Sequence, residues 1–108
     1  MDNEDLVKQR RFLMELEQGV RVANREVIHQ RIPPVTIDNL LPFAVSVARL
    51  RGRYLEAAFK FAEKDSGDPL DAAEVADLQR QRQMYEEARD AFEALRHAIE
   101  RGYVELSE

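Results

Sequence analysis

The sequence predicts an all-α protein of three long antiparallel helices in an up-down-up bundle. Residues that break helices cluster at Pro33–Pro34, in the Asp65–Pro69 segment and at Gly102, and they divide the chain into three long pieces. Within each piece apolar residues recur with the spacing of one helix face, and almost no alternation of period two is visible. We therefore expect helices over about residues 3–31, 38–64 and 69–101.

The composition is that of one small folded domain. Of the 108 residues, 44% are apolar and 34% are charged, which excludes a disordered acidic chain and a membrane span. This length predicts a single helical domain over residues 1–108, with a short C-terminal tail over 102–108. The chain has no cysteine, so disulfides and thiolate metal sites are excluded. The acidic start, Met1 to Asp5, precedes no apolar stretch, and we expect a cytoplasmic protein without a signal peptide.

The first predicted helix carries a heptad seam, which is typical of a helix that packs along another helix. Its apolar residues are Leu6, Leu13, Leu16, Val20, Ala23 and Val27. Val7, Met14 and Ile28 widen this seam on one side. Gly19 lies inside the helix, where it costs about 1 kcal/mol relative to alanine unless close packing offsets the loss.

The second predicted helix has two apolar lines. The first consists of Leu40, Phe43, Val47, Leu50, Tyr54, Ala57 and Phe61. The second, about 100° round the helix, consists of Leu41, Val45, Ala48, Leu55, Phe59 and Ala62. One neighbour cannot cover a helix that is apolar round more than half its circumference, so we expect this helix to touch at least two others. Thr36 or Asp38 is the expected N-cap, and Pro42 falls in or near the first turn, where a kink is one option.

The third predicted helix begins at Asp68–Pro69 or at the capping box from Asp71 to Glu74. Its core-facing residues recur every seventh position, and Gly102 is expected to end it as a left-handed cap. Three arginines on one shoulder each have a glutamate four residues later, a spacing that favours ion pairs on one face. These pairs are Arg82–Glu86, Arg89–Glu93 and Arg96–Glu100.

A single up-down-up bundle would leave the second apolar line of the central helix partly uncovered. The third helix would be about 48 Å long and the second about 35 Å, so one end of the third would also lack a neighbour. We expect a second copy of the chain to complete the bundle as a two-fold homodimer. The predicted interface is the second apolar line, with an unidentified protein as a further partner.

Histidine is the first place to look for a metal site. Glu26 and His29 form a Glu-x-x-His unit, a spacing that di-metal helical bundles use. The seam residue Val27 leaves Glu26 at the flank and His29 on the far side, so this unit is a weak candidate. We expect no cofactor and no catalytic residues, but a metal-binding bundle built on Glu26 and His29 is one alternative function.

Arg51 is the second candidate, because it lies beside the apolar arc of the central helix, next to Gly52. A guanidinium in that place needs a carboxylate or a carbonyl partner, since an unpaired buried charge is very costly. We expect a buried ion pair with an acid of a neighbouring helix or protomer, and an anion pocket is the alternative. The sequence does not separate these two readings.

The arginines give little support to a nucleic-acid interface. Arg49, Arg51 and Arg53 alternate along the helix, so their side chains lie about 200° apart and do not share a face. The net charge of -5 also disfavours a nucleic-acid partner, and an accessory factor for DNA or RNA is therefore the second alternative. The function we expect is a non-enzymatic interaction module, a dimeric adaptor, chaperone-like or regulatory protein that acts through apolar helix faces.

Overall fold

The computed structural model describes residues 2–64 and 72–107, and it confirms the all-α class with three helices. They are α1 (Asn3–His29), α2 (Ile37–Lys64) and α3 (Ala72–Glu100). Over the described residues there is no strand beyond an isolated bridge between Val35 and Leu106. Within the same residues, no helix carries an apolar stretch long enough to cross a bilayer. The predicted starts of the third helix at Asp68 and Asp71 lie outside the described residues.

The chain forms two compact units. One unit consists of Met1–Thr36 together with Arg96–Glu108, and the other of Ile37–Leu95. We call the first the α1 unit and the second the α2–α3 unit; α3 supplies its last turn to the α1 unit and its remaining length to the other. The packing of α1 against the helix pair, and the count of one domain, stay predictions.

Local hydrogen bonds fix both ends of α1. The carboxylate of Asp2 accepts a hydrogen bond from the Asp5 amide at 2.9 Å and caps the first turn. The helix ends at His29, two residues earlier than the sequence predicts. The amides of Arg31 and Ile32 both donate to the Ile28 carbonyl, at 2.9 and 3.0 Å, which tightens the chain into a turn before the two prolines.

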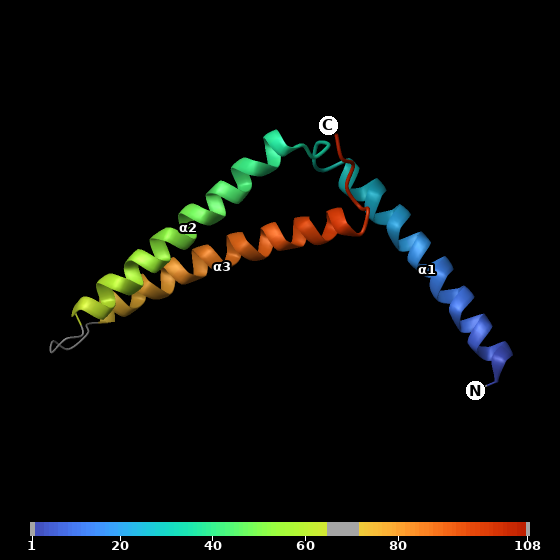
Figure 1. Cartoon of the computed structure of the whole chain (residues 1–108), viewed down its shortest axis with the longest axis horizontal. Coiled ribbons are helices and arrows are strands. Elements are labelled where there is room, and N and C mark those ends of the chain that lie inside the picture. Colours follow the sequence, from blue (N-terminus) through green and yellow to red (C-terminus); the bar gives the residue numbers. More distant parts are fainter. Residues whose placement is uncertain (1, 65–71, 108) are drawn as a thin grey trace. The chain divides into compact units, whose positions relative to one another are not determined.

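In the α2–α3 unit the two helices lie side by side and antiparallel (Figure 1). The ring centroids of Phe43 and Phe92 are 5.4 Å apart, and those of Tyr54 and Tyr85 are 6.1 Å apart. Residue numbers therefore rise along α2 as they fall along the facing side of α3, which is the pairing of antiparallel helices. Val47, 6% exposed, lies between these two ring pairs along α2. The first apolar line of α2 therefore faces α3, as predicted.

The start of α2 and its proline agree with the sequence pattern. The helix begins at Ile37, which puts Thr36 in the N-cap position. Pro42 lies inside the helix rather than ahead of it, and its carbonyl accepts a hydrogen bond from the Ser46 hydroxyl at 3.1 Å. The helix continues past Pro42 to Lys64.

Ion pairs along α3 follow the predicted spacing in two of three cases. Arg82 lies 4.0 Å from Glu86, and Arg96 lies 3.3 Å from Glu100. Arg89 instead binds the adjacent Asp90 at 3.1 Å, which corrects the expected pair with Glu93. The guanidinium of Arg89 also lies over the Tyr85 ring, and this contact draws its side chain toward the start of the helix.

Gly102 ends α3 as the predicted left-handed cap. Its φ is 76°, its amide donates to Ile99, and the amide of Tyr103 donates to Ala98, the two hydrogen bonds of a Schellman motif. The chain then runs beside Val35. The Val35 amide donates to the Glu105 carbonyl at 2.8 Å, and the Ser107 amide donates to the Val35 carbonyl at 2.9 Å.

The tail is also held to α1 by side chains. Val104 is only 7% exposed, and Arg101 binds Glu17 at 2.9 Å. His29 Nδ1 lies 3.1 Å from Glu105 Oε2. The segment after Gly102 therefore folds back onto its own chain and joins the end of α3 to α1.

Two glycines allow a matched test of this cap. Gly102→Ala should lower the free energy of unfolding by about 1 kcal/mol, because an L-residue is strained at a positive φ. Gly19→Ala should raise it by up to about 1 kcal/mol, because a Cβ there meets nothing within 4 Å and alanine favours the helix. Urea unfolding followed by circular dichroism measures both. Equal effects of the two substitutions would contradict the cap.

Candidate functional site

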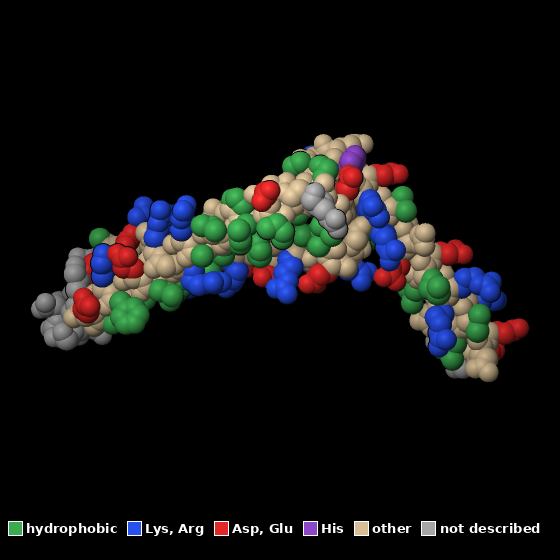
Figure 2. Space-filling model, turned by 45° about the horizontal axis from the view of Figure 1, so that its top comes forward, with side chains coloured by type: hydrophobic (Ala, Val, Ile, Leu, Met, Phe, Trp, Pro, Cys, Tyr) green, Lys and Arg blue, Asp and Glu red, His purple; other side chains and the backbone are tan. Residues whose placement is uncertain are grey.

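The second apolar line of α2 remains on the surface of the α2–α3 unit. We call it the outer stripe, and it consists of Leu41, Val45, Ala48, Leu55, Phe59 and Ala62. All six side chains are exposed, among them Leu41 at 58%, Leu55 at 50% and Phe59 at 72%. Figure 2 shows apolar side chains gathered on the visible surface of the helix pair, between groups of charged ones. The residues are placed as the sequence predicts, and their role as an interface stays a prediction.

Helical geometry explains why α3 leaves the outer stripe uncovered. The stripe lies more than a quarter of a turn round α2 from the line that contains Val47 and Tyr54. A single neighbouring helix covers one such face. Gly52 lies within the stripe, and a Cβ built there meets nothing within 4 Å. No close packing inside the described chain therefore accounts for a glycine at this position.

The seam of α1 is a second apolar surface. No residue of α1 is buried, and Leu6, Leu13, Leu16, Val20 and Val27 are all exposed. Met14, which widens the seam, is 68% exposed. Figure 2 shows apolar side chains reaching the surface along α1 between charged ones.

The C-terminal tail contacts α1 beside the seam and on the far side of the helix. Arg101 binds Glu17, the Cδ atom of Arg21 lies 4.0 Å from a Cβ built at Gly102, and Glu105 binds His29. Glu17 lies about 70° round the helix from the centre of the seam and flanks it, whereas Arg21 lies about 110° away and His29 lies on the far side. The tail therefore borders the seam at Glu17 and leaves the seam residues themselves exposed.

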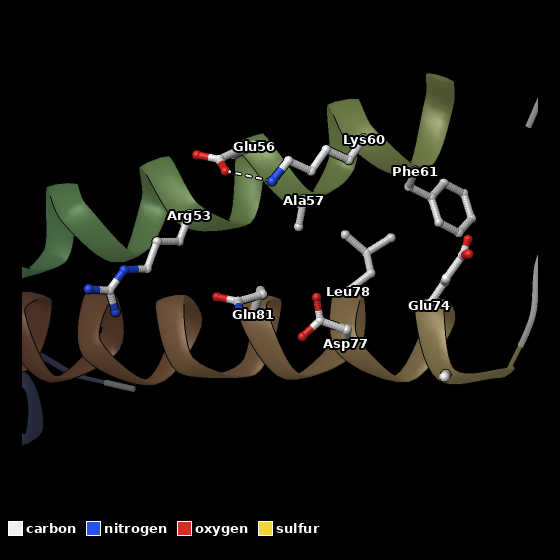
Figure 3. A pocket seen from close by; sticks show the side chains of 10 residues that line it. Arg53, Glu56, Ala57, Lys60, Phe61, Glu74, Asp77, Leu78 and Gln81 are labelled. Atoms are coloured by element: carbon white, nitrogen blue, oxygen red, sulfur yellow. Dashed lines mark ion pairs between the residues drawn. The ribbon is translucent and has the colours of Figure 1, made fainter. Parts of the chain in front are cut away.

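A cleft of about 440 Å³ lies between α2 and α3 near the ends that adjoin residues 65–71 (Figure 3). The apolar side chains of Ala57 and Leu78 lie between the two helices, and charged groups surround them. Lys60 binds Glu56 at 2.9 Å, and this hydrogen bond raises the pKa of the lysine. Gln81 Oε1 is buried here, and no described residue forms a hydrogen bond with it.

Two acidic residues of this cleft have ion-pair partners. Arg80 binds Asp77 at 2.7 Å, and Lys60 binds Glu56. Acidic and basic side chains both line the cleft, so its charge is mixed. The sequence did not predict this cleft, because its walls come from two helices whose relative register only the structure gives.

Arg51 is exposed in the described chain, and its partner there is a tyrosine hydroxyl; the expected ion pair and the anion pocket stay predictions. Its Nε donates to the Tyr85 hydroxyl at 3.1 Å, and its guanidinium carbon lies 5.2 Å from the ring centroid. Arg89 lies over the same ring at 5.3 Å. The hydrogen bond from Arg51, assisted by Arg89, lowers the pKa of Tyr85. The aromatic ring and the surrounding water replace the carboxylate that burial would have required.

Glu26 and His29 line a small hollow with Arg25, Tyr103 and Glu105, about 300 Å³ in volume. The imidazole of His29 is turned to Glu105, a residue of the tail that the sequence analysis did not connect with it. Among residues 2–64 and 72–107, no three histidine, aspartate or glutamate side chains are grouped so that they could hold a metal ion.

Comparisons with known proteins give no relative from which a function could be transferred. No family model, no curated protein and no solved structure matches the chain. The two exposed apolar surfaces, with the side chains beside them, are therefore the features of the described residues that bear on function.

Because Arg51 donates a hydrogen bond to Tyr85, we expect the pKa of this tyrosine to lie below its ordinary value. Arg51→Met should raise the pKa of Tyr85 toward its ordinary value of about 10, because the variant loses the hydrogen bond that favours the phenolate. Nuclear magnetic resonance titration of the Tyr85 ring carbons measures the change. Arg53→Met is the matched control, since Arg53 lines the cleft on another side of α2.

The same shift sets a direction for stability. The folded chain releases the Tyr85 proton more readily than the unfolded chain does, so wild type should gain stability over Arg51→Met as the pH rises from the folded pKa towards about 10. This gain should be absent well below the folded pKa. An unchanged Tyr85 titration in Arg51→Met would refute the contact.

Proposed function

We propose that this chain is a non-enzymatic helical interaction module, a dimeric adaptor or regulatory protein that acts in the cytoplasm through apolar helix faces. The observation that carries the proposal is the outer stripe of α2, which the folded α2–α3 unit leaves exposed along its length. A contiguous apolar surface of this kind, bordered by charged residues, is typical of a protein interface.

The outer stripe is long enough to support an association. It spans residues 41–62, about 32 Å at 1.5 Å per residue. Complete burial of a leucine or phenylalanine side chain is worth about 1.5–3 kcal/mol, whereas association costs about 4 to 15 kcal/mol. One or two side chains could not offset that cost. A two-fold dimer buries the stripe twice, and this doubles the apolar gain for one association.

The seam of α1 is the surface that remains for a further partner protein. Its heptad spacing suits a helix that carries an apolar heptad of its own, because such side chains insert between those of the seam. The tail contacts α1 beside the seam at Glu17 and on its far side at His29, so the seam residues themselves stay available to a helix. A module with one self-associating face and one free face has the properties of an adaptor.

The dimer can be tested by light scattering coupled to size exclusion across micromolar concentrations. Wild type is expected to be dimeric, and Leu55→Asp to be monomeric, because the variant puts two carboxylates into the apolar interface. Ser46→Asp is the matched control, since Ser46 lies on the exposed polar side of α2. A monomeric wild type at these concentrations would refute the proposal, and so would a dimer that Leu55→Asp leaves intact.

The free face of α1 has a separate test. A protein captured from native lysate and then purified should bind wild type directly, and Leu13→Asp should weaken this binding at least about tenfold, because a carboxylate interrupts the seam. Lys8→Asp, which lies away from both the seam and Met14, should bind as wild type does. Isothermal titration calorimetry measures the affinities, and equal affinities would refute a role of the seam.

A further inference from the structure

We propose that the outer stripes of two copies pack antiparallel in a single register, about a two-fold axis that passes between positions 53 and 54. In this arrangement Gly52 of one copy lies opposite Leu55 of the other. Ala48 lies opposite Phe59, and Val45 opposite Ala62. The inference rests on the proposed function and specifies the partner, a second copy, together with its direction and register.

The outer stripe has the repeat that a two-helix seam requires. Val45 and Phe59 are fourteen residues apart, with Gly52 midway between them. Ala48, Leu55 and Ala62 each follow one of these positions by three residues, which completes a heptad pattern of alternating three- and four-residue steps. Every one of these positions is exposed in the α2–α3 unit. The seam is therefore continuous and available to another helix.

Side-chain size distinguishes the two possible directions. In the antiparallel register each large side chain faces a small one, since Phe59 meets Ala48 and Leu55 meets Gly52. In a parallel pair each residue would face its own copy. Two Phe59 rings would then crowd one layer, and two Gly52 residues would leave another layer empty. Cores require even filling, and both crowding and voids are destabilising, so the antiparallel direction is favoured.

The antiparallel register also explains Gly52. A glycine in a helix interior costs about 1 kcal/mol relative to alanine, and no side chain of the described chain packs against this one. The leucine of a second copy fits over the missing side chain and allows the two helices to approach closely. Gly19, the other glycine inside a helix, lies outside the outer stripe.

Charge complementarity supports the same register. Arg49 flanks the stripe next to Val45, and it has no ion-pair partner among the residues that the structure describes. Glu56 flanks the stripe on the same side, one heptad later; its side chain is 67% exposed and also binds Lys60 of its own helix at 2.9 Å. In the antiparallel register Arg49 of each copy lies beside Glu56 of the other, with an axial offset of about 3 Å. In this register the two Arg49–Glu56 pairs join opposite charges across the interface, whereas the two Glu56 carboxylates, and likewise the two Arg51 guanidinium groups, lie about 7.5 Å apart along the axis.

A second copy is the occupant that these observations specify. The large and small side chains that match, and the flanking charges of Arg49 and Glu56 that pair, all come from the same face of α2. A two-fold rotation makes this face complementary to itself. Such self-complementarity is the defining property of the interface in a two-fold dimer. A protein of unrelated sequence is not expected to carry a leucine opposite Gly52 and a carboxylate beside Arg49 at the same spacing.

Cysteine cross-linking tests the direction directly, because the chain contains no cysteine of its own. An equimolar mixture of full-length Ala48→Cys and Phe59→Cys chains should form a disulfide between the two variants under mild oxidation. Neither variant alone should cross-link to itself, since its two copies lie about 16 Å apart along the axis, beyond the span of a disulfide. Ser46→Cys, on the polar side of α2, is the control for random collisions.

A charge exchange tests the register. Arg49→Glu should raise the dimer dissociation constant about tenfold, because it turns two attractive pairs into two repulsive ones. The double variant Arg49→Glu with Glu56→Arg should return the constant to within about threefold of wild type. In a parallel dimer Arg51 would lie beside Glu56 instead. Rescue of Glu56→Arg by Arg51→Glu rather than by Arg49→Glu would therefore overturn the inference.

The outcomes separate the inference from the proposed function. Self-cross-linking of Ala48→Cys, with no link to Phe59→Cys, would mean a parallel dimer, which keeps the interaction module and overturns the register. Leu55→Asp could disrupt the dimer while Ala48→Cys cross-links neither to Phe59→Cys nor to itself and the charge exchange gives no rescue. That combination would likewise overturn the register alone. A monomeric wild type would overturn both.

Discussion

The arrangement within the α2–α3 unit depends on one constraint: α2 has apolar side chains on two sides, and α3 covers only one of them. Its first line packs on α3 through Val47 and the aromatic pairs Phe43–Phe92 and Tyr54–Tyr85. The outer stripe is not covered within the α2–α3 unit. Apolar surface gains free energy when it leaves water, so the exposed stripe favours association.

In the α1 unit a long helix is held in place although none of its residues is buried. No residue of α1 is buried, so the packing of α1 itself contributes little. The unit is held by the turn at Gly102, by the backbone hydrogen bonds that join Val35 to the tail, and by the pair Arg101–Glu17. All of these contacts leave the seam exposed. A helix presented in this way is suited to binding, since contact with a partner would bury the seam without unfolding the unit.

The sequence predicted those features that depend on near neighbours in the chain. The left-handed cap at Gly102 and the two lines of α2 follow from local spacing, and both are found. The structure gives Arg51 a partner that the sequence did not predict, because Tyr85 lies 34 residues away, and spacing along one helix does not reveal a contact across two helices. The bond between His29 and Glu105 was missed for the same reason. Arg89 binds Asp90 rather than Glu93, and its guanidinium lies over the ring of Tyr85, one turn earlier on the same helix.

The interpretation of Gly52 needs both the sequence and the structure. In the sequence alone it is consistent with a close helix crossing or with a ligand that approaches the backbone. The structure shows that no neighbour within the described chain occupies the space beside it and that it lies within the exposed stripe. A costly glycine at the centre of an exposed apolar stripe makes physical sense when a large side chain from outside fills the gap. In the proposed antiparallel dimer that side chain is Leu55 of the second copy, which the two-fold axis brings opposite Gly52.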